Sequence, residues 1–141
     1  MATISLAVNS TTLVINGRTI NDTMAGDRFV LAPVNPATAR INGAGGVSIQ
    51  ARTDKDVHDL TINIMKESAD DSWLNGLLKE SPPAIITGSL KNSFTRDGTD
   101  GIESYSMESG SFTTKPTGTY SDTDGNALMT YVIQVIAVRS L

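Results

Sequence analysis

Residues 59–65 are the stretch that most constrains what this chain can fold into. Apolar and polar side chains alternate along it: Leu60, Ile62 and Ile64 against Asp59, Thr61 and Asn63. Successive side chains of a β-strand point to opposite faces, so this period of two predicts a strand with one buried face and one face in water. The fold must therefore cover one side of this strand and leave the other side wet.

A helix is predicted over residues 69–80, directly after this strand. Ser68 and Asp71 have the spacing of a capping box in its Asp variant, and acidic side chains are favourable at the positive end of the helix dipole. Four apolar residues at helical spacing form the predicted packing face: Trp73, Leu74, Leu77 and Leu78. Pro82 and Pro83 end the helix, because a proline disfavours the α conformation in the residue before it. We interpret the segment as a helix that covers a β-structure.

The rest of the chain has the pattern of short strands joined by turns. Asn16-Gly17 lies between two alternating segments and predicts a hairpin, since both positions accept a positive φ. Further strands are predicted at residues 3–8, 28–32, 47–52, 84–90, 105–114 and 128–138, with turns at 97–101 and 120–126. The sum predicts a mainly β fold: an antiparallel β-sandwich or small barrel with one flanking α-helix, in a single domain over residues 1–141.

Residues 35–46 form the long loop of this prediction. They show no periodicity and contain three glycines among small residues. One interpretation is a flexible surface connection. The other is a functional arm, because long loops without structure in compact domains are usually functional or disordered. After the loop, residues 47–52 alternate again, and we expect them to pair with residues 59–65 as a hairpin.

Composition excludes several classes of site and partner. The chain has no cysteine and one histidine, so disulfide scaffolds, thiolate zinc sites and two-histidine metal sites are excluded. Its formal net charge is −4 with no basic cluster, which argues against tight binding to nucleic acid. No apolar run approaches the ~20 residues that span a bilayer, and no secretory signal precedes the first strand. We expect a protein made in the cytoplasm, without a membrane partner.

The acidic turns do not match a calcium site. Residues 122–126 resemble the start of an EF-hand loop, but the glycine is fourth instead of sixth, and Ile133 occupies the place of the bidentate glutamate. The segment is interpreted as an Asp-rich turn, and so is the segment that holds Asp97 and Asp100. No metal is expected.

The sequence gives equally little support for a catalytic site. His58 lies beside Asp59, but the sequence has no Gly-x-Ser-x-Gly elbow to supply a nucleophile. Glu103 and Glu108 are carboxylates without a visible set of convergent groups. We expect no catalytic residue and no cofactor, and the protein is not predicted to be an enzyme.

Several short patterns follow one another along nearly the whole chain. In order they are Asn16-Gly17, Gly26-Asp27-Arg28-Phe29, the loop that ends in Gly45-Gly46, residues 59–64, Ser72-Trp73-Leu74-Asn75, residues 105–112 and Asp124-Gly125-Asn126. In this order of parts the chain resembles bacteriophage tail tube proteins, which share their fold with the tube protein of the type VI secretion system.

The resemblance implies a structural virion protein. Its protomers would pool their strands into a hexameric ring with one continuous β-barrel around a lumen. Rings would stack head to tail into the tail tube, and double-stranded DNA would pass through the lumen without specific binding. The long loop would make the ring–ring contact, through Asn35, Pro36, Arg40, Ile41, Asn42, Gly45 and Gly46. A sheath (in a contractile tail), a baseplate and a tail terminator are the further partners implied.

One face of the predicted hairpin is assigned to the lumen by its polarity. Burying Val47, Ile49 and Ala51 together with the aliphatic face of residues 59–65 removes apolar area worth ~25 cal/mol per Å². Burying the other face would strand polar groups. The predicted lumen-lining residues are Ser48, Gln50, Arg52, Asp59, Thr61, Asn63 and Glu108.

Two other functions are compatible with the pattern. One is a carbohydrate- or protein-binding β-sandwich module on a virion, which would stack exposed aromatic side chains on sugars. With one Trp, three Tyr and three Phe in the chain, aromatic residues are few for that role. The other is a secreted ring protein of the type VI kind.

Overall fold

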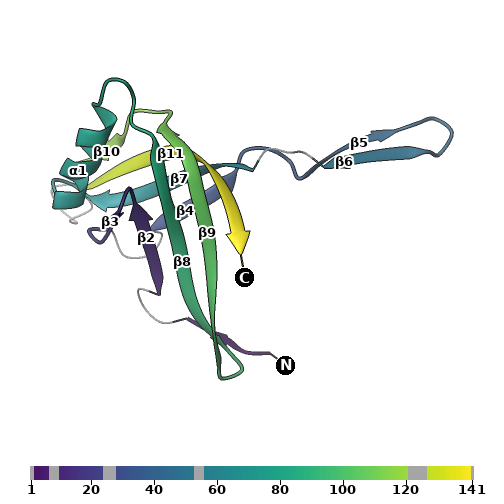
Figure 1. The fold of residues 1–141 in the computed structure, drawn as a ribbon, viewed down its shortest axis with the longest axis horizontal. Coiled ribbons are helices and arrows are strands. Elements are labelled where there is room, and N and C mark those ends of the chain that lie inside the picture. Colours follow the sequence, from purple (N-terminus) through teal and green to yellow (C-terminus); the bar gives the residue numbers. More distant parts are fainter. Residues whose placement is uncertain (1, 7–9, 24–27, 53–55, 121–126, 141) are drawn as a thin grey trace.

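The computed structural model describes residues 2–6, 10–23, 28–52, 56–120 and 127–140. Within these residues the elements follow in the order β1 (Ile4–Ser5), β2 (Thr11–Ile15), β3 (Arg18–Thr19), β4 (Phe29–Pro33), β5 (Thr38–Asn42), β6 (Ser48–Arg52), β7 (Val57–Met65), α1 (Ala69–Leu78), β8 (Ile86–Arg96), β9 (Thr99–Phe112), β10 (Thr117–Thr119) and β11 (Leu128–Ser140) (Figure 1). The predicted turn at residues 122–126 lies outside the described residues.

The main sheet is antiparallel and open. Among the described residues it has nine strands, in the order β3-β2-β8-β9-β11-β7-β4, with β1 added to β8 and β10 added to β11. β2, β8 and β9 run across β4, β7 and β11, so the sheet bends over on itself (Figure 1). The mainly β antiparallel class with a flanking helix is confirmed, and the sheet does not close into a barrel.

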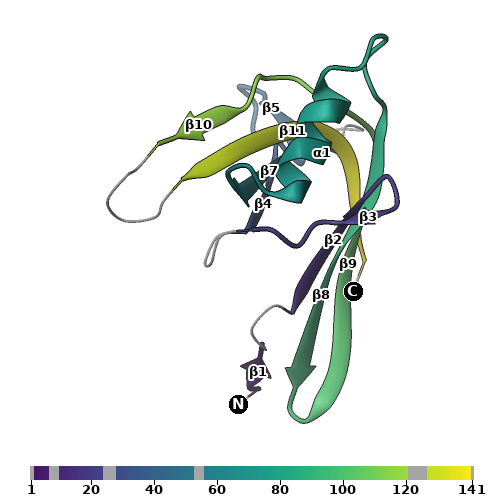
Figure 2. The ribbon, with the colours of Figure 1, turned by 90° about the vertical axis from the view of Figure 1, so that its left-hand side faces the viewer.

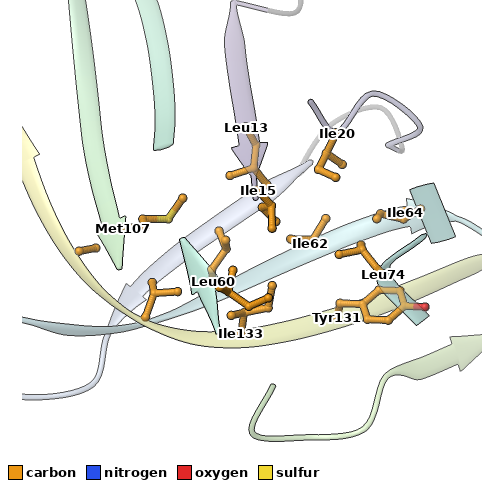
Figure 3. Packing of buried hydrophobic residues seen from close by; sticks show 13 residues of the cluster. Leu13, Ile15, Ile20, Leu60, Ile62, Ile64, Leu74, Met107, Tyr131 and Ile133 are labelled. Atoms are coloured by element: carbon orange, nitrogen blue, oxygen red, sulfur yellow. The ribbon is translucent and has the colours of Figure 1, made fainter. Parts of the chain in front are cut away.

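The core fills the inside of this bend. β7 contributes Leu60, Ile62 and Ile64, as the alternation of residues 59–65 predicts. The other buried residues come from β2, β8, β9, β11, the helix and the segment after β3: Leu13, Ile15, Ile20, Leu74, Ile86, Met107, Tyr131, Ile133, Val135 and Ala137 (Figure 3). One face of each central strand is therefore buried.

The helix α1 begins as its capping pattern predicts. The Ser68 hydroxyl accepts a hydrogen bond from the Asp71 N–H at 3.3 Å, and the Asp71 carboxylate accepts one from the Glu67 N–H at 2.8 Å. The helix ends at Leu78 with Lys79 as its C-cap, two residues before the predicted end. Such a difference is within the usual uncertainty of helix ends.

The predicted packing face of the helix meets the core unevenly. Leu74 is fully buried, and Trp73 and Leu77 are partly buried against the same cluster. Leu78, at the last turn, is half-buried and lies outside the core cluster. The Arg18 guanidinium lies 5.5 Å from the centre of the Trp73 ring and covers it.

A buried carboxylate ties the helix to the segment after β3. Asp70 is 3% exposed, and its carboxylate accepts hydrogen bonds from Arg18 Nε (2.8 Å), the Asn21 N–H (2.8 Å) and the Asp22 N–H (2.9 Å). Burial alone would raise the pKa of Asp70, but these donors favour the carboxylate more strongly, and the pKa lies below its ordinary value.

The hairpin at Asn16-Gly17 is confirmed. Both residues have positive φ, 47° and 82°, and they join β2 to β3. Farther on, Asp97-Gly98 makes the tight turn between β8 and β9, with φ of 49° and 81°. Both strands are longer than predicted. β8 begins two residues after the predicted start and continues to Arg96, and β9 begins at Thr99, before the predicted start at residue 105.

The predicted pairing of residues 47–52 with residues 59–65 is wrong. β6 pairs with β5, whereas β7 pairs with β4 and β11. The reason is that part of the predicted loop at residues 35–46 is a strand. Residues 38–42 form β5, which is nearer to β6 along the chain than β7 is and pairs with it. Val47 and Ile49, which the prediction buried, are 70% and 62% exposed, and Ala51 is also exposed.

Gly88 is required where β8 passes β2. A Cβ at this position would overlap the backbone carbonyl group of Val14. Gly76 lies in the helix, and apart from its chain neighbours and the backbone of its own helix no atom lies within 4 Å of the place its Cβ would take. The two glycines therefore form a matched pair, one constrained by packing and one unconstrained.

We expect Gly88→Ala to lower the free energy of unfolding by at least ~2 kcal/mol, because a backbone group must move to admit the methyl group. Gly76→Ala is expected to raise it by ~0.5–1 kcal/mol, since alanine loses less entropy in a helix. Urea unfolding of both variants measures the difference. Equal effects would contradict the close approach of β8 and β2.

Asp70→Asn is expected to lower the free energy of unfolding by about 2 kcal/mol at neutral pH, because it removes a carboxylate that accepts three hydrogen bonds. The folded pKa is depressed, so the difference from wild type is complete above the unfolded pKa of about 3.9 and shrinks as the pH falls towards the folded pKa. Urea unfolding between pH 2 and 7 measures it, with Glu80→Gln as the exposed control. A difference that does not change with pH would contradict this assignment.

Candidate assembly surfaces

The face of the main sheet that points away from the core carries rows of polar side chains, and exposed Ile136, Val138 and Val30 lie among them. The polar side chains come from β7, β11 and β9, and we call the following set the polar sheet face: Asp59, Thr61, Asn63, Ser106, Glu108, Ser111, Thr130 and Gln134. Register places Asp59 opposite Gln134 and Asn63 opposite Thr130. Since paired residues of antiparallel strands share a face, the polar side chains form neighbouring rows.

Hydrogen bonds across β7 and β11 join these rows. The Thr130 hydroxyl donates to Asn63 Oδ1 at 2.9 Å, and Gln134 Nε2 donates to Asp59 Oδ1 at 3.4 Å. Glu108 reaches the same face through β9, where it lies opposite Ile136 of β11. The two charged members of the polar sheet face, Asp59 and Glu108, are both acidic.

The other three predicted lumen residues lie elsewhere. Ser48, Gln50 and Arg52 are on β6, in a two-stranded ribbon with β5 that extends away from the body of the molecule (Figure 1). The structure thus brings together Asp59, Thr61, Asn63 and Glu108 but places the β6 residues on a separate sheet. A lumen role stays a prediction for both groups.

The β5–β6 ribbon has two chemically distinct faces. Register pairs Thr38 with Arg52, Arg40 with Gln50 and Asn42 with Ser48, and these six residues are the ribbon polar face. The intervening pairs are Ala39 with Ala51 and Ile41 with Ile49. Together with Val47, which continues the alternation, these residues are the ribbon apolar face. Every residue of both strands is exposed.

The predicted ring–ring contact residues are spread along this ribbon. Asn35 and Pro36 lie at its base, and the remainder lie on β5 or near the turn: Arg40, Ile41, Asn42, Gly45 and Gly46. The Gly43 N–H donates to the Val47 carbonyl oxygen at 2.7 Å, and Gly46 has a φ of 83°. The predicted loop is thus an ordered hairpin within one chain. The role of these residues in a ring–ring contact stays a prediction.

Sequence reasoning missed the ribbon apolar face. The signal was available: residues 38–42 and 47–51 both alternate between polar and apolar, on either side of a glycine-rich turn. The short length of residues 38–42 and the neighbouring prolines concealed that alternation.

The main sheet ends at β3 on one side and at β4 on the other. β4 pairs with β7 along one side, and no other described strand pairs with its second side. Val30 of β4 is 43% exposed, and Val34, just beyond the strand, is 47% exposed. An edge of this kind presents N–H and C=O groups that can pair with another chain.

The residues considered for catalysis do not converge. His58 Nδ1 lies 3.0 Å from the Asp56 carbonyl oxygen, and the His58 ring meets the edge of the Tyr105 ring. Glu103 is paired with Arg139, and it lies on the face of β9 opposite to Glu108 because their spacing is odd.

In the part of the chain that the structure describes, no group of three His, Cys, Asp or Glu residues could hold a metal ion. No helix of that part is long and apolar enough to cross a membrane.

Comparison with solved structures identifies the fold. The chain is similar to a chain of the sheath–tube complex of an extracellular contractile injection system, PVC, in its extended state. The TM-score is 0.60 at 10% sequence identity, over 96% of this chain and 91% of the other. No protein-family model matches the sequence, and no curated protein matches it. The chain thus has a tail-tube-like fold, and the match covers nearly the whole length of both chains.

Proposed function

We propose that this chain is the repeating structural subunit of a tail tube, with copies joined into hexameric rings that stack into a conduit. The observation that carries the proposal is the open sheet, which buries one face, presents rows of polar side chains on the other and leaves strand edges for a neighbour. The tail-tube-like fold and the order of sequence patterns support the same role.

The two ends of the sheet support ring formation. A contact between two different surfaces of identical chains closes into a ring when its rotation permits. β4 at one end of the sheet and the β3–β2 end at the other are different surfaces of this kind. Pairing them between neighbours would continue the sheet around the ring. The polar sheet face would then line the lumen, with the helix on the outside.

The proposed cargo is double-stranded DNA, delivered from a virion into a host cell. A lumen with acidic Asp59 and Glu108 repels a polyanion and lets it pass without adhering. The second candidate function is the tube of a contractile injection system. The similarity of this chain to a solved sheath–tube complex of an extracellular contractile injection system favours it. A sheath, a baseplate and a terminator are the partners proposed, and the subunit acts without catalysis or cofactor.

The assembly is tested by negative-stain electron microscopy and sedimentation velocity of the purified protein. We expect six-fold rings and stacked tubes whose fraction rises with protein concentration. A protein that stays monomeric at all concentrations and binds carbohydrate would contradict the proposal and favour the β-sandwich binding module.

The lumen assignment is tested by cysteine labelling, because the chain has no cysteine of its own. In assembled tubes, Thr61→Cys should react with a bulky thiol reagent at least tenfold more slowly than Ser72→Cys, which lies exposed on the helix. Both variants should react similarly once the tubes are dissociated. Equal rates in tubes would place Thr61 on the outside.

A further inference from the structure

Among the side chains that the structure describes, one amino group is buried without a hydrogen-bond partner. It is Nζ of Lys66, in the link between β7 and α1. A lysine ammonium carries three N–H donors and no acceptor, and buried polar groups in folded proteins are nearly always hydrogen-bonded. Arg18 and Arg139, by contrast, each pair with a carboxylate of their own chain. Lys66 therefore has donors for an acceptor from outside the chain.

Lys66 lines a surface pocket of about 250 Å³ at the start of the helix. One wall is the helix itself, with Ser72 and Asn75, and the other is the end of β10 and the start of β11, with Tyr120 and Met129. Figure 2 shows the helix beside the β10–β11 pair, and the pocket lies where the two meet. Pockets for drug-sized molecules measure ~300–1,000 Å³, so this smaller space suits a single side chain.

The Tyr120 ring covers the amino group. Nζ of Lys66 lies 2.7 Å from the centre of the ring, in a cation–π contact. Gly118 leaves room for the ring, because a Cβ at that position would lie 3.1 Å from Cε2 of Tyr120. Tyr120 is nevertheless 78% exposed. Since so little of it is packed against the protein, the ring can turn aside and open Nζ to the pocket.

Two acidic residues in the pocket wall limit which anions fit. Both oxygens of Asp71 are in use: Oδ1 accepts a hydrogen bond from the Tyr131 hydroxyl at 2.6 Å, and Oδ2 accepts one from the Glu67 N–H at 2.8 Å. Glu67 itself is exposed. One lysine and two acids leave no positive excess, so a phosphate group, with its charge of about −1.5 to −2, is repelled. A single carboxylate is repelled less and gains charge-assisted hydrogen bonds from the ammonium.

We propose that Lys66 and Tyr120 form a covered receptor for one carboxylate, the side chain of an aspartate or glutamate on another polypeptide. The Tyr120 ring turns aside and the carboxylate accepts hydrogen bonds from Nζ. Ser72 and Asn75 lie three residues apart on the helix, so they share a face and offer a hydroxyl and an amide donor to the same ligand. Tubes can form without this receptor, so its failure leaves the proposed function intact.

Binding is tested with a capped Gly-Glu-Gly tripeptide, added to the protein below the concentration at which tubes form. The NMR chemical shifts of Tyr120 and Asn75 report occupancy. We expect saturable binding that weakens about tenfold in Lys66→Met, because the charged donor is lost. Lys79→Met, which replaces an exposed lysine after the helix, should leave it unchanged. Capped Gly-Gln-Gly and inorganic phosphate should each bind about tenfold more weakly than Gly-Glu-Gly.

The cover is tested by Tyr120→Ala, which should bind the Glu peptide about threefold more tightly, because no ring has to be displaced first. Urea unfolding checks that every variant retains the fold. Equal binding of the Glu and Gln peptides, or unchanged binding in Lys66→Met, would overturn the receptor. Weaker binding in Tyr120→Ala would overturn the ring as its cover.

Carbodiimide crosslinking of assembled protein identifies the source of the carboxylate. The reagent joins an amine to a carboxylate in direct contact, and a mixture of isotope-labelled and unlabelled copies separates bonds between chains from bonds within one. A bond from Lys66 to an acid of another copy, absent in Lys66→Arg, assigns the carboxylate to a second copy. Peptide binding without that bond assigns it to a different protein.

Discussion

The segregation of aliphatic side chains to one face of β7 and β11 is the constraint on which the structure depends. The two strands pair over nine residues, so that Ile62 lies beside Tyr131 and Leu60 beside Ile133, all fully buried. A shift of one residue in that register would expose the aliphatic rows and bury carboxylates and amides. The bend of the sheet serves the same constraint, because the sheet buries its aliphatic face by folding over itself, with the helix α1 contributing Leu74 to the core.

This one-sided core determines what remains outside. Asp70 holds the helix to the segment after β3, so the helix closes the core without touching the polar sheet face. Gly88 lets β8 pass close to β2, which keeps the bent half of the sheet tight. The polar rows on β7, β9 and β11, the edge at β4 and the β5–β6 ribbon take no part in the core. Their chemistry is free to serve contacts between copies.

The sequence predicted what local physics determines and missed what depends on distant pairing. The alternation of residues 59–65, the Ser68 cap and the Asn16-Gly17 turn each act within a few residues, and each is confirmed. The pairing of residues 47–52 was wrong because alternation specifies a face but not a neighbour, and the shorter β5 lies nearer. Of the predicted lumen set, the four residues on β7 and β9 share one face, whereas the three on β6 were assigned through that wrong pairing.

An exposed aliphatic ribbon is a hazard for a free protein, since unpaired hydrophobic strands promote aggregation. This chain confines the hazard to one face of a narrow ribbon and places Arg40, Gln50 and Arg52 on the other.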